Sequence, residues 1–119
     1  MSKAVKIYHN PRCSKSRETL NLLQSHGVEP EVVLYLETPA DAATLRQLLK
    51  MLGMESAREL MRRKEDLYAS LNLVDSSLSE DELIQAMVEH PKLMERPIVV
   101  ANGQARIGRP PEHVLEIIG

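Results

Sequence analysis

The sequence predicts an α/β protein with a four-stranded mixed sheet in the order βαβ, helical insertion, ββα. Three observations support this prediction. An alternating strand pattern at residues 5–8 is followed by a helical pattern and then by an apolar run at residues 32–36. Residues 55–90 have helical spacing and no strand pattern. Two further short strands flank Asn102-Gly103, a dipeptide typical of two-residue hairpins.

The first part of the chain is expected to form a right-handed βαβ unit. Apolar residues from Ser14 onward suit one face of a helix that Gly27 ends. The continuous apolar run Val32–Leu36 predicts a strand that is buried on both faces. A second helix is expected to open near Asp41 and to end at Gly53.

The middle of the chain is expected to be a helical insertion over about residues 40–92. Ser56 can cap a short helix that runs through Arg62. Ser79, with Glu82 three residues later, forms a capping-box pattern at the start of another helix.

The end of the chain predicts a hairpin followed by a helix. Residues 97–100 and 104–107 have strand character, and Pro110-Pro111 suits the first turn of a helix. With no linker or repeat to divide the chain, we expect one domain over residues 1–119.

Composition limits the class of protein. The 119 residues are 43% hydrophobic without Trp or Phe, which predicts one aliphatic core. A net charge of −2 gives no general reason to expect nucleic-acid or membrane partners. The chain enters a strand almost at once and has no apolar run long enough to cross a bilayer, so we expect a soluble cytoplasmic protein.

The only cysteine, Cys13, falls where the first strand passes into the first helix. A helix N-terminus offers free backbone N–H groups and a partial positive charge, which lower the pKa of a thiol from about 8.5 to roughly 3.5–7.5 in activated cases. The same groups, with the nearby cations Arg12, Lys15 and Arg17, suit a tetrahedral oxyanion. The alternative is an inert buried thiol, and composition does not decide between the two.

Counting thiols restricts the chemistry further. One cysteine excludes an internal disulfide, and no Cys/His cluster has the spacing of a zinc site, so no metal is expected. An enzyme that oxidises its single thiol must take the second thiol from outside. Glutathione is the abundant candidate in a reducing cytoplasm.

Four segments together closely resemble the glutaredoxin-coupled arsenate reductase family, which is ArsC-like: His9–Arg17, Leu34–Leu36, Glu95–Val100 and Gly108–Pro110. The resemblance covers essentially the whole chain and implies a thioredoxin-like fold with a helical insert. It implies reduction of arsenate to arsenite, with glutathione as co-substrate, glutaredoxin as partner and no tightly bound cofactor.

The resemblance also implies roles for individual residues. Cys13 is expected to be the nucleophile, and His9 the histidine that favours its thiolate. The three oxyanion-binding arginines of the family correspond to Arg62, Arg96 and Arg109. Arg96-Pro97 is similar to the cis-proline position that faces the active cysteine. Arg63 is adjacent to Arg62, so which of these two faces the site is left open.

The residues also argue for one class of arsenate reductase over another. The phosphatase-like class has a cysteine and an arginine separated by five residues, and here Thr19 stands six positions after Cys13. Without the resemblance, Arg62 would be assigned to a solvated helix face. Arg96 and Arg109 each precede a proline at a strand end, where loops carry functional sites.

Other functions stay open at this stage. One is a different glutathione-linked thiol reductase on the same fold. Another is a non-enzymatic regulator that binds RNA polymerase, although such regulators usually carry Cys-x-x-Cys and residue 16 here is Ser. A third is a degenerate structural member of the family, which the intact cysteine and arginines disfavour.

Overall fold

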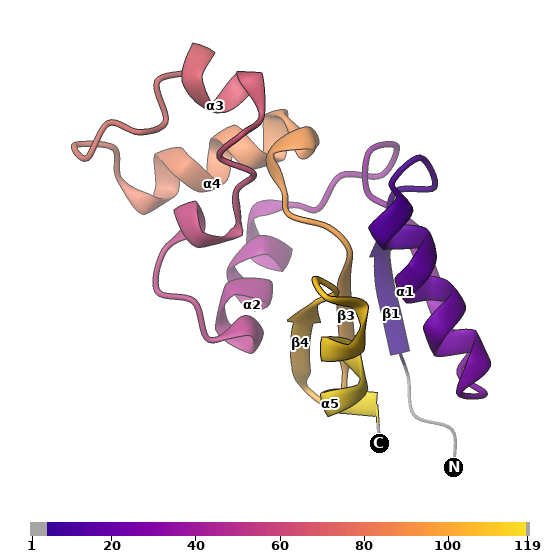
Figure 1. The fold of residues 1–119 in the computed structure, drawn as a ribbon. Helices are drawn as coiled ribbons and strands as arrows, with labels where there is room; N and C mark the ends of the chain where they lie inside the picture. The colour runs from indigo at the N-terminus through magenta and orange to yellow at the C-terminus, as the bar shows by residue number, and fades with distance from the viewer. Residues whose placement is uncertain (1–4, 119) are drawn as a thin grey trace. The chain divides into compact units, whose positions relative to one another are not determined.

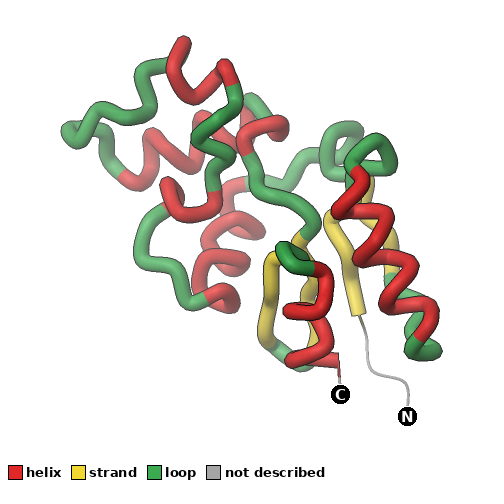
Figure 2. The backbone as a smooth tube through the Cα atoms, in the orientation of Figure 1, coloured by secondary structure: helices red, strands yellow, loops and turns green. Residues whose placement is uncertain are grey.

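The computed structural model describes residues 5–118, which form two compact units. The first unit holds residues 5–38 and 96–118, and the second is Pro39–Glu95. All the strands lie in the first unit, as Figure 2 shows by colour. The insertion predicted over about residues 40–92 falls within the second unit, while a single domain over the whole chain stays a prediction. Between residues 5 and 118, no helix has the length and apolar character needed to span a membrane.

The first unit is built on a four-stranded sheet with the order β2-β1-β3-β4 (Figure 1). Its strands are β1 (Val5–His9), β2 (Glu31–Leu34), β3 (Ile98–Ala101) and β4 (Gln104–Ile107). β1 pairs in parallel with β2 and antiparallel with β3, and β3 pairs antiparallel with β4. The predicted mixed sheet is therefore confirmed. The hairpin turn is also confirmed, because Asn102 and Gly103 both have positive φ, as its two-residue type requires.

The second strand differs from the prediction for Val32–Leu36. β2 ends at Leu34 because the chain turns there, with the backbone N–H groups of Glu37 and Thr38 donating to the Leu34 carbonyl at 2.9 and 2.8 Å. β2 is also an edge strand, in which Val32 keeps 43% of its surface exposed, and Leu36, in the turn beyond it, keeps 38%. Burial on both faces is wrong here, because a short apolar run does not reveal whether a strand will be central or at an edge.

One face of the sheet carries the core of the first unit. α1 (Ser14–Ser25), the 3₁₀ helix η3 (Pro111–Val114) and α5 (Leu115–Ile118) contact one another and the strands. The buried cluster on this face comprises Val5, Ile7, Leu23, Val99, Ala101, Val114 and Ile117. Alternate strand residues share a face, and each buried aliphatic side chain contributes about 1.5–3 kcal/mol. This packing holds α1 alongside β1, with the start of the helix near the end of that strand (Figure 1).

The second unit is helical, as predicted. Its elements are α2 (Ala42–Leu52), η1 (Ala57–Leu60), α3 (Asp66–Ser70), α4 (Glu80–Glu89) and η2 (Pro91–Leu93). The Asp41 carboxylate caps α2 by accepting from the Thr44 N–H, and Gly53 ends that helix with φ of 73°. The capping box of Ser79 and Glu82 is confirmed.

The helix predicted from Ser56 through Arg62 is shorter than expected. Ser56 does cap it, but it is a 3₁₀ helix that ends at Leu60. Met61 is extended and forms an isolated antiparallel bridge with Met94. This pairing between distant segments outweighs the local helical pattern, so the prediction of a helix through Arg62 is wrong.

Candidate active site

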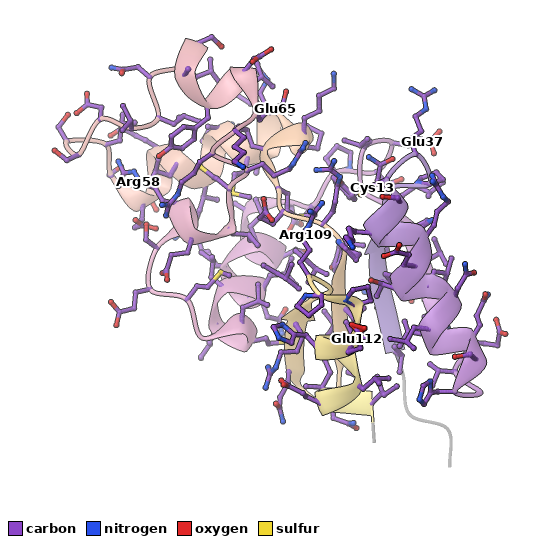
Figure 3. The ribbon with its side chains drawn as sticks, in the orientation of Figure 1. Cys13, Glu37, Arg58, Glu65, Arg109 and Glu112 are labelled. Carbon is purple, nitrogen blue, oxygen red and sulfur yellow. The ribbon has the colours of Figure 1, made fainter. Side chains whose placement is uncertain are left out.

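Cys13 is the N-cap residue of α1, at the end of the loop that follows β1 (Figure 3). The Cys13 N–H closes the preceding turn by donating to the Asn10 carbonyl at 3.0 Å. The Cys13 carbonyl accepts the first helical hydrogen bond, from the Arg17 N–H, at 3.0 Å. The predicted position at a helix N-terminus is therefore confirmed, and 9% of the residue's surface is exposed.

The pKa of the Cys13 thiol lies below its ordinary value as the result of opposing influences. Burial raises the pKa because it disfavours the charged form. The backbone N–H groups of Ser16 and Lys15 and the positive charges of Arg96 and Arg109 lower it by more. The two backbone N–H groups act as hydrogen-bond donors to the sulfur, and the two arginines act through their positive charge.

Arg109 approaches the sulfur directly. Its Nη2 lies 3.7 Å from the Cys13 Sγ, and its Nε donates to the Arg96 carbonyl at 2.8 Å. The hydrogen bond at Nε restrains the guanidinium group, so that one of its terminal nitrogens faces the thiol. Figure 3 labels Arg109, which lies in the segment after β4, and Cys13, which lies at the start of α1.

Arg96 holds a positive charge that the protein leaves unsatisfied. Its Nε and Nη1 atoms are buried and have no hydrogen-bond partner among residues 5–118. Leaving such a group unpaired costs about 1–3 kcal/mol, and more when it is charged. Two neighbouring oxygens of an oxyanion match the planar donors of a guanidinium group. Arg96 precedes Pro97 through a cis peptide bond, as the resemblance implies.

Gly108 fixes the backbone from which Arg109 extends. A Cβ at this position would lie 2.5 Å from Thr19 Oγ1 and 2.9 Å from Pro97 Cγ. The Gly108 N–H donates to the Pro97 carbonyl at 2.9 Å, and its own carbonyl accepts from Thr19 Oγ1 at 3.4 Å. Helix α1, the segment after Arg96 and the loop before Arg109 therefore meet where only glycine fits.

His9 is buried beside the loop, but its hydrogen bond goes to Ser16. Its Nδ1 lies 2.6 Å from Ser16 Oγ, and the Asn10 N–H donates to the same oxygen at 3.0 Å. Burial and, secondarily, the charge of Arg17 lower the pKa of His9, which makes the imidazole neutral at pH 7. Among the residues described, His9 makes no hydrogen bond to Cys13. Its expected role in favouring the thiolate stays a prediction.

Two buried polar residues of α1 were not singled out for the site from the sequence. Ser16 and Thr19 have no exposed surface and lie on the same side of the helix as Leu23. The pattern that would have found them is the spacing i, i+3, i+7, which places Ser16, Thr19 and Leu23 on one face. Small hydroxyl residues on a buried face indicate a polar contact, here with His9 and with Gly108.

Arg62 belongs to the second unit. Its Nη1 pairs with Glu65 Oε2 at 3.1 Å, and its backbone N–H donates to the Leu93 carbonyl at 2.6 Å. Arg63 is exposed to solvent. The oxyanion role of Arg62, and the choice between Arg62 and Arg63, stay predictions.

A pocket of about 360 Å³ lies beside the Cys13 loop. It is lined by His9, by residues 10–12 of the loop, and by Leu34, Leu36 and Glu37 at and beyond the end of β2. Within residues 5–118, no cluster of His, Cys, Asp and Glu side chains has the arrangement of a metal site.

Comparison with known proteins agrees with this architecture. A model of the ArsC family matches residues 8–117. The YfgD protein of Escherichia coli (strain K12) is 84% identical over 119 residues, which is 100% of both chains. An arsenate reductase of Haemophilus influenzae is 51% identical over 115 residues, covering 97% of this chain and 99% of that protein. The solved structure of an arsenate reductase from Vibrio cholerae is 60% identical with a TM-score of 0.96, covering 98% of this chain and 99% of the other. The predicted thioredoxin-like fold is thereby confirmed.

Proposed function

The chain belongs to the ArsC family of arsenate reductases, and on this premise we propose that it reduces arsenate to arsenite through a covalent intermediate on Cys13. The observation that carries the proposal is the 3.7 Å approach of Arg109 Nη2 to the Cys13 sulfur. The buried, unpaired nitrogens of Arg96 support it, because the oxygens of an oxyanion would supply the acceptors that these donors lack. A nucleophile and oxyanion donors are thus available within one unit of the protein.

Arsenate binding is the first part of the proposed mechanism. Arg96 and Arg109 each offer planar N–H donors that neutralise the charge on the arsenate oxygens. The free amides at the start of α1 add partial positive charge on the same side as the sulfur. By resemblance, Arg62 is proposed as a third oxyanion ligand.

The second part is attack by the Cys13 thiolate on arsenic. A sulfur–arsenic bond forms, and an arsenic–oxygen bond breaks. The departing oxygen takes up a proton and leaves as water, so arsenic remains in its +5 state. The groups that lower the pKa of Cys13 increase the fraction of the thiol that is in its reactive, ionised form.

The third part is the reduction itself, for which the chain needs thiols from outside because it has one cysteine. The glutathione thiol displaces a second oxygen, which leaves as water. A glutaredoxin thiolate then attacks the glutathione sulfur, so that a disulfide forms and the sulfur–arsenic bond breaks. Its electron pair stays on arsenic, which becomes arsenic(III). Water finally cleaves the remaining sulfur–arsenic bond, releasing arsenite and the Cys13 thiol.

This chemistry is proposed to take place in the cytoplasm, where reduced glutathione and glutaredoxin are supplied. No tightly bound cofactor takes part. A reductase of glutathione mixed disulfides would use the same thiolate without needing an oxyanion. The unpaired buried nitrogens of Arg96 favour the arsenate reaction over that alternative.

The test is steady-state arsenate reduction with glutathione and glutaredoxin, comparing the wild-type protein with Cys13→Ser. We expect turnover that depends on arsenate and on glutaredoxin in the wild type, and only the background rate in the variant. Ser25→Ala, which alters an exposed side chain near the end of α1, serves as the control and should keep wild-type turnover. Equal rates in the wild type and Cys13→Ser would overturn the proposal.

A further inference from the structure

The 360 Å³ pocket beside the Cys13 loop has no part in the arsenate chemistry proposed above. Neither Cys13 nor Arg96 nor Arg109 lines it. It is formed instead by the outer side of the loop that precedes Cys13 and by the turn that ends β2. The mechanism needs a second binding event, that of an external thiol, and this pocket is a cavity beside the Cys13 loop that neither of the proposed oxyanion ligands Arg96 and Arg109 lines.

The lining carries one group of each charge. Arg12 lies in the loop and Glu37 lies beyond the end of β2, and both residues are exposed. Within the described part of the chain, neither the Arg12 guanidinium group nor the Glu37 carboxylate forms a hydrogen bond or an ion pair. The two groups line the same pocket without neutralising each other. A ligand that carries both a carboxylate and an ammonium group would complement them.

The rest of the lining has the character of a small-ligand site. Leu34, Leu36 and Pro11 supply apolar surface, and His9 and Asn10 supply polar groups. The volume lies near the lower end of the range for small-molecule pockets, about 300–1,000 Å³. Such a cavity is large enough for a tripeptide and too small for a folded partner.

We infer that this pocket binds the thiol co-substrate, a small zwitterionic thiol peptide of the glutathione type. Arg12 binds a carboxylate of the peptide, and Glu37 binds its ammonium group. This inference rests on the proposed function, because that function is what requires an external thiol. The loop residue Arg12 directly precedes Cys13, so a peptide held here lies beside the segment that carries the nucleophile. The binding event itself makes and breaks no covalent bond.

The experiment measures binding of S-methylglutathione, which cannot react at sulfur, to the full chain by titration calorimetry. We expect wild-type protein to bind it, and Arg12→Gln and Glu37→Gln each to bind it about tenfold or more weakly. That change corresponds to loss of a charge-assisted interaction, since about 1.4 kcal/mol is a factor of ten. Glu112→Gln is the matched control, because Glu112 is exposed in the same unit and lies well away from Glu37 in Figure 3. It should bind like the wild type.

A second ligand identifies which group each residue binds. S-methylglutathione with its glycine carboxylate converted to an amide should bind the wild type more weakly. If Arg12 binds that carboxylate, Arg12→Gln should bind the amide as weakly as it binds S-methylglutathione. Glu37→Gln should bind the amide more weakly than S-methylglutathione, by the same factor as the wild type does. A deaminated analogue should show the opposite pattern, with no further loss in Glu37→Gln.

The outcome separates this inference from the proposed function. Absence of S-methylglutathione binding in the wild type, or equal binding in the wild type and both variants, would overturn the inference. Arsenate protection of Cys13 against alkylation should be the same in the wild type and in Glu37→Gln, since Glu37 is not among the residues to which the oxyanion is assigned. If arsenate is not turned over but S-methylglutathione binding depends on Arg12 and Glu37, the proposed function fails and the pocket assignment stands.

Discussion

The Nδ1 atom of His9 lies 2.6 Å from the hydroxyl oxygen of Ser16, which also accepts the Asn10 N–H at 3.0 Å. One hydroxyl group therefore ties the end of β1, the start of the loop and the first turn of α1 together. Cys13 lies inside the segment that this contact closes. The hydroxyl at position 16 stands where a Cys-x-x-Cys pair would place its second sulfur, and here it organises the loop.

Replacing Ser16 with Ala should destabilise the protein by about 1–3 kcal/mol. The reason is that a buried imidazole nitrogen and the Asn10 N–H both lose their partner. Chemical denaturation monitored by circular dichroism measures the change. Ser25→Ala, an exposed position on the same helix, should stay within about 0.5 kcal/mol of the wild type. Similar stability in the two variants would contradict a structural role for the Ser16 hydroxyl.

The stability of the protein should fall as the pH drops below the ordinary pKa of histidine, 6.5. Burial and then the charge of Arg17 lower the pKa of His9 in the folded state, so the unfolded chain takes up a proton first. The stability linked to His9 is fully present above pH 6.5 and is lost as the pH falls toward the lowered value. Unfolding free energies measured from about pH 8 to pH 5 should show a weaker pH dependence in His9→Gln than in the wild type.

Alkylation of Cys13 by iodoacetamide should have its pH midpoint below that of an ordinary thiol. Arg96→Gln and Arg109→Gln should each move the midpoint upward, because each removes a positive charge that lowers the pKa of the thiol. Arg106→Gln removes a charge that pairs with Glu116 and should leave the midpoint in place. Arsenate should slow the labelling of the wild type. A midpoint unaffected by Arg96 and Arg109 would show that these charges do not act on the sulfur.

Gly108→Ala should destabilise the protein by about 1–3 kcal/mol, the usual cost of forcing atoms into a packed site. It should also weaken arsenate protection of Cys13, because the new methyl group displaces the backbone that carries Arg109. Unfolding and alkylation assays measure the two effects. The double variant with Thr19→Ala should recover part of the stability, since the added Cβ would lie 2.5 Å from Thr19 Oγ1. Simple additivity of the two changes would contradict this steric explanation.

The third proposed oxyanion ligand can be identified by comparing Arg62→Gln with Arg63→Gln. If Arg62 binds arsenate, its variant should raise the arsenate concentration needed to protect Cys13 by about tenfold or more, while Arg63→Gln should not. Arg62→Gln also breaks the ion pair with Glu65. Glu65→Gln, which breaks the same pair but keeps the arginine, is the control and should protect normally. A loss confined to Arg63→Gln would shift the assignment by one residue.

Local sequence patterns were enough for those elements whose ends are set by nearby residues. The capping box of Ser79 and Glu82 and the turn at Asn102-Gly103 satisfy backbone groups within a few residues, so they could be located from the sequence. The apolar run at Val32 did not reveal an edge strand, because strand order depends on the whole sheet. The end of η1 could not be predicted from local sequence either, since it depends on the pairing of Met61 with Met94.

The site shows the same division. The position of Cys13 at a helix start follows from the adjacent turn and helix, and the sequence predicted it. The burial of Ser16 and its contact with His9 depend on how α1 packs on the sheet, which a search for apolar residues overlooks. The contact of Arg109 with Cys13 joins segments that are distant in the chain, and its geometry became visible only in the structure.

The β3–β4 hairpin positions the guanidinium groups of Arg96 and Arg109. Ile98 and Ile107 are partners in the ladder, so Arg96 and Arg109 each lie two residues beyond the same rung. The turn at Asn102-Gly103, at the opposite end of the ladder, therefore sets the position of Arg109 relative to Arg96. Adding or deleting one residue there would shift β4 against β3 and move Arg109, whereas Arg96 would keep its place because β3 stays paired with β1. The length of the turn at the far end of the hairpin thus determines how the two arginines of the oxyanion site are spaced.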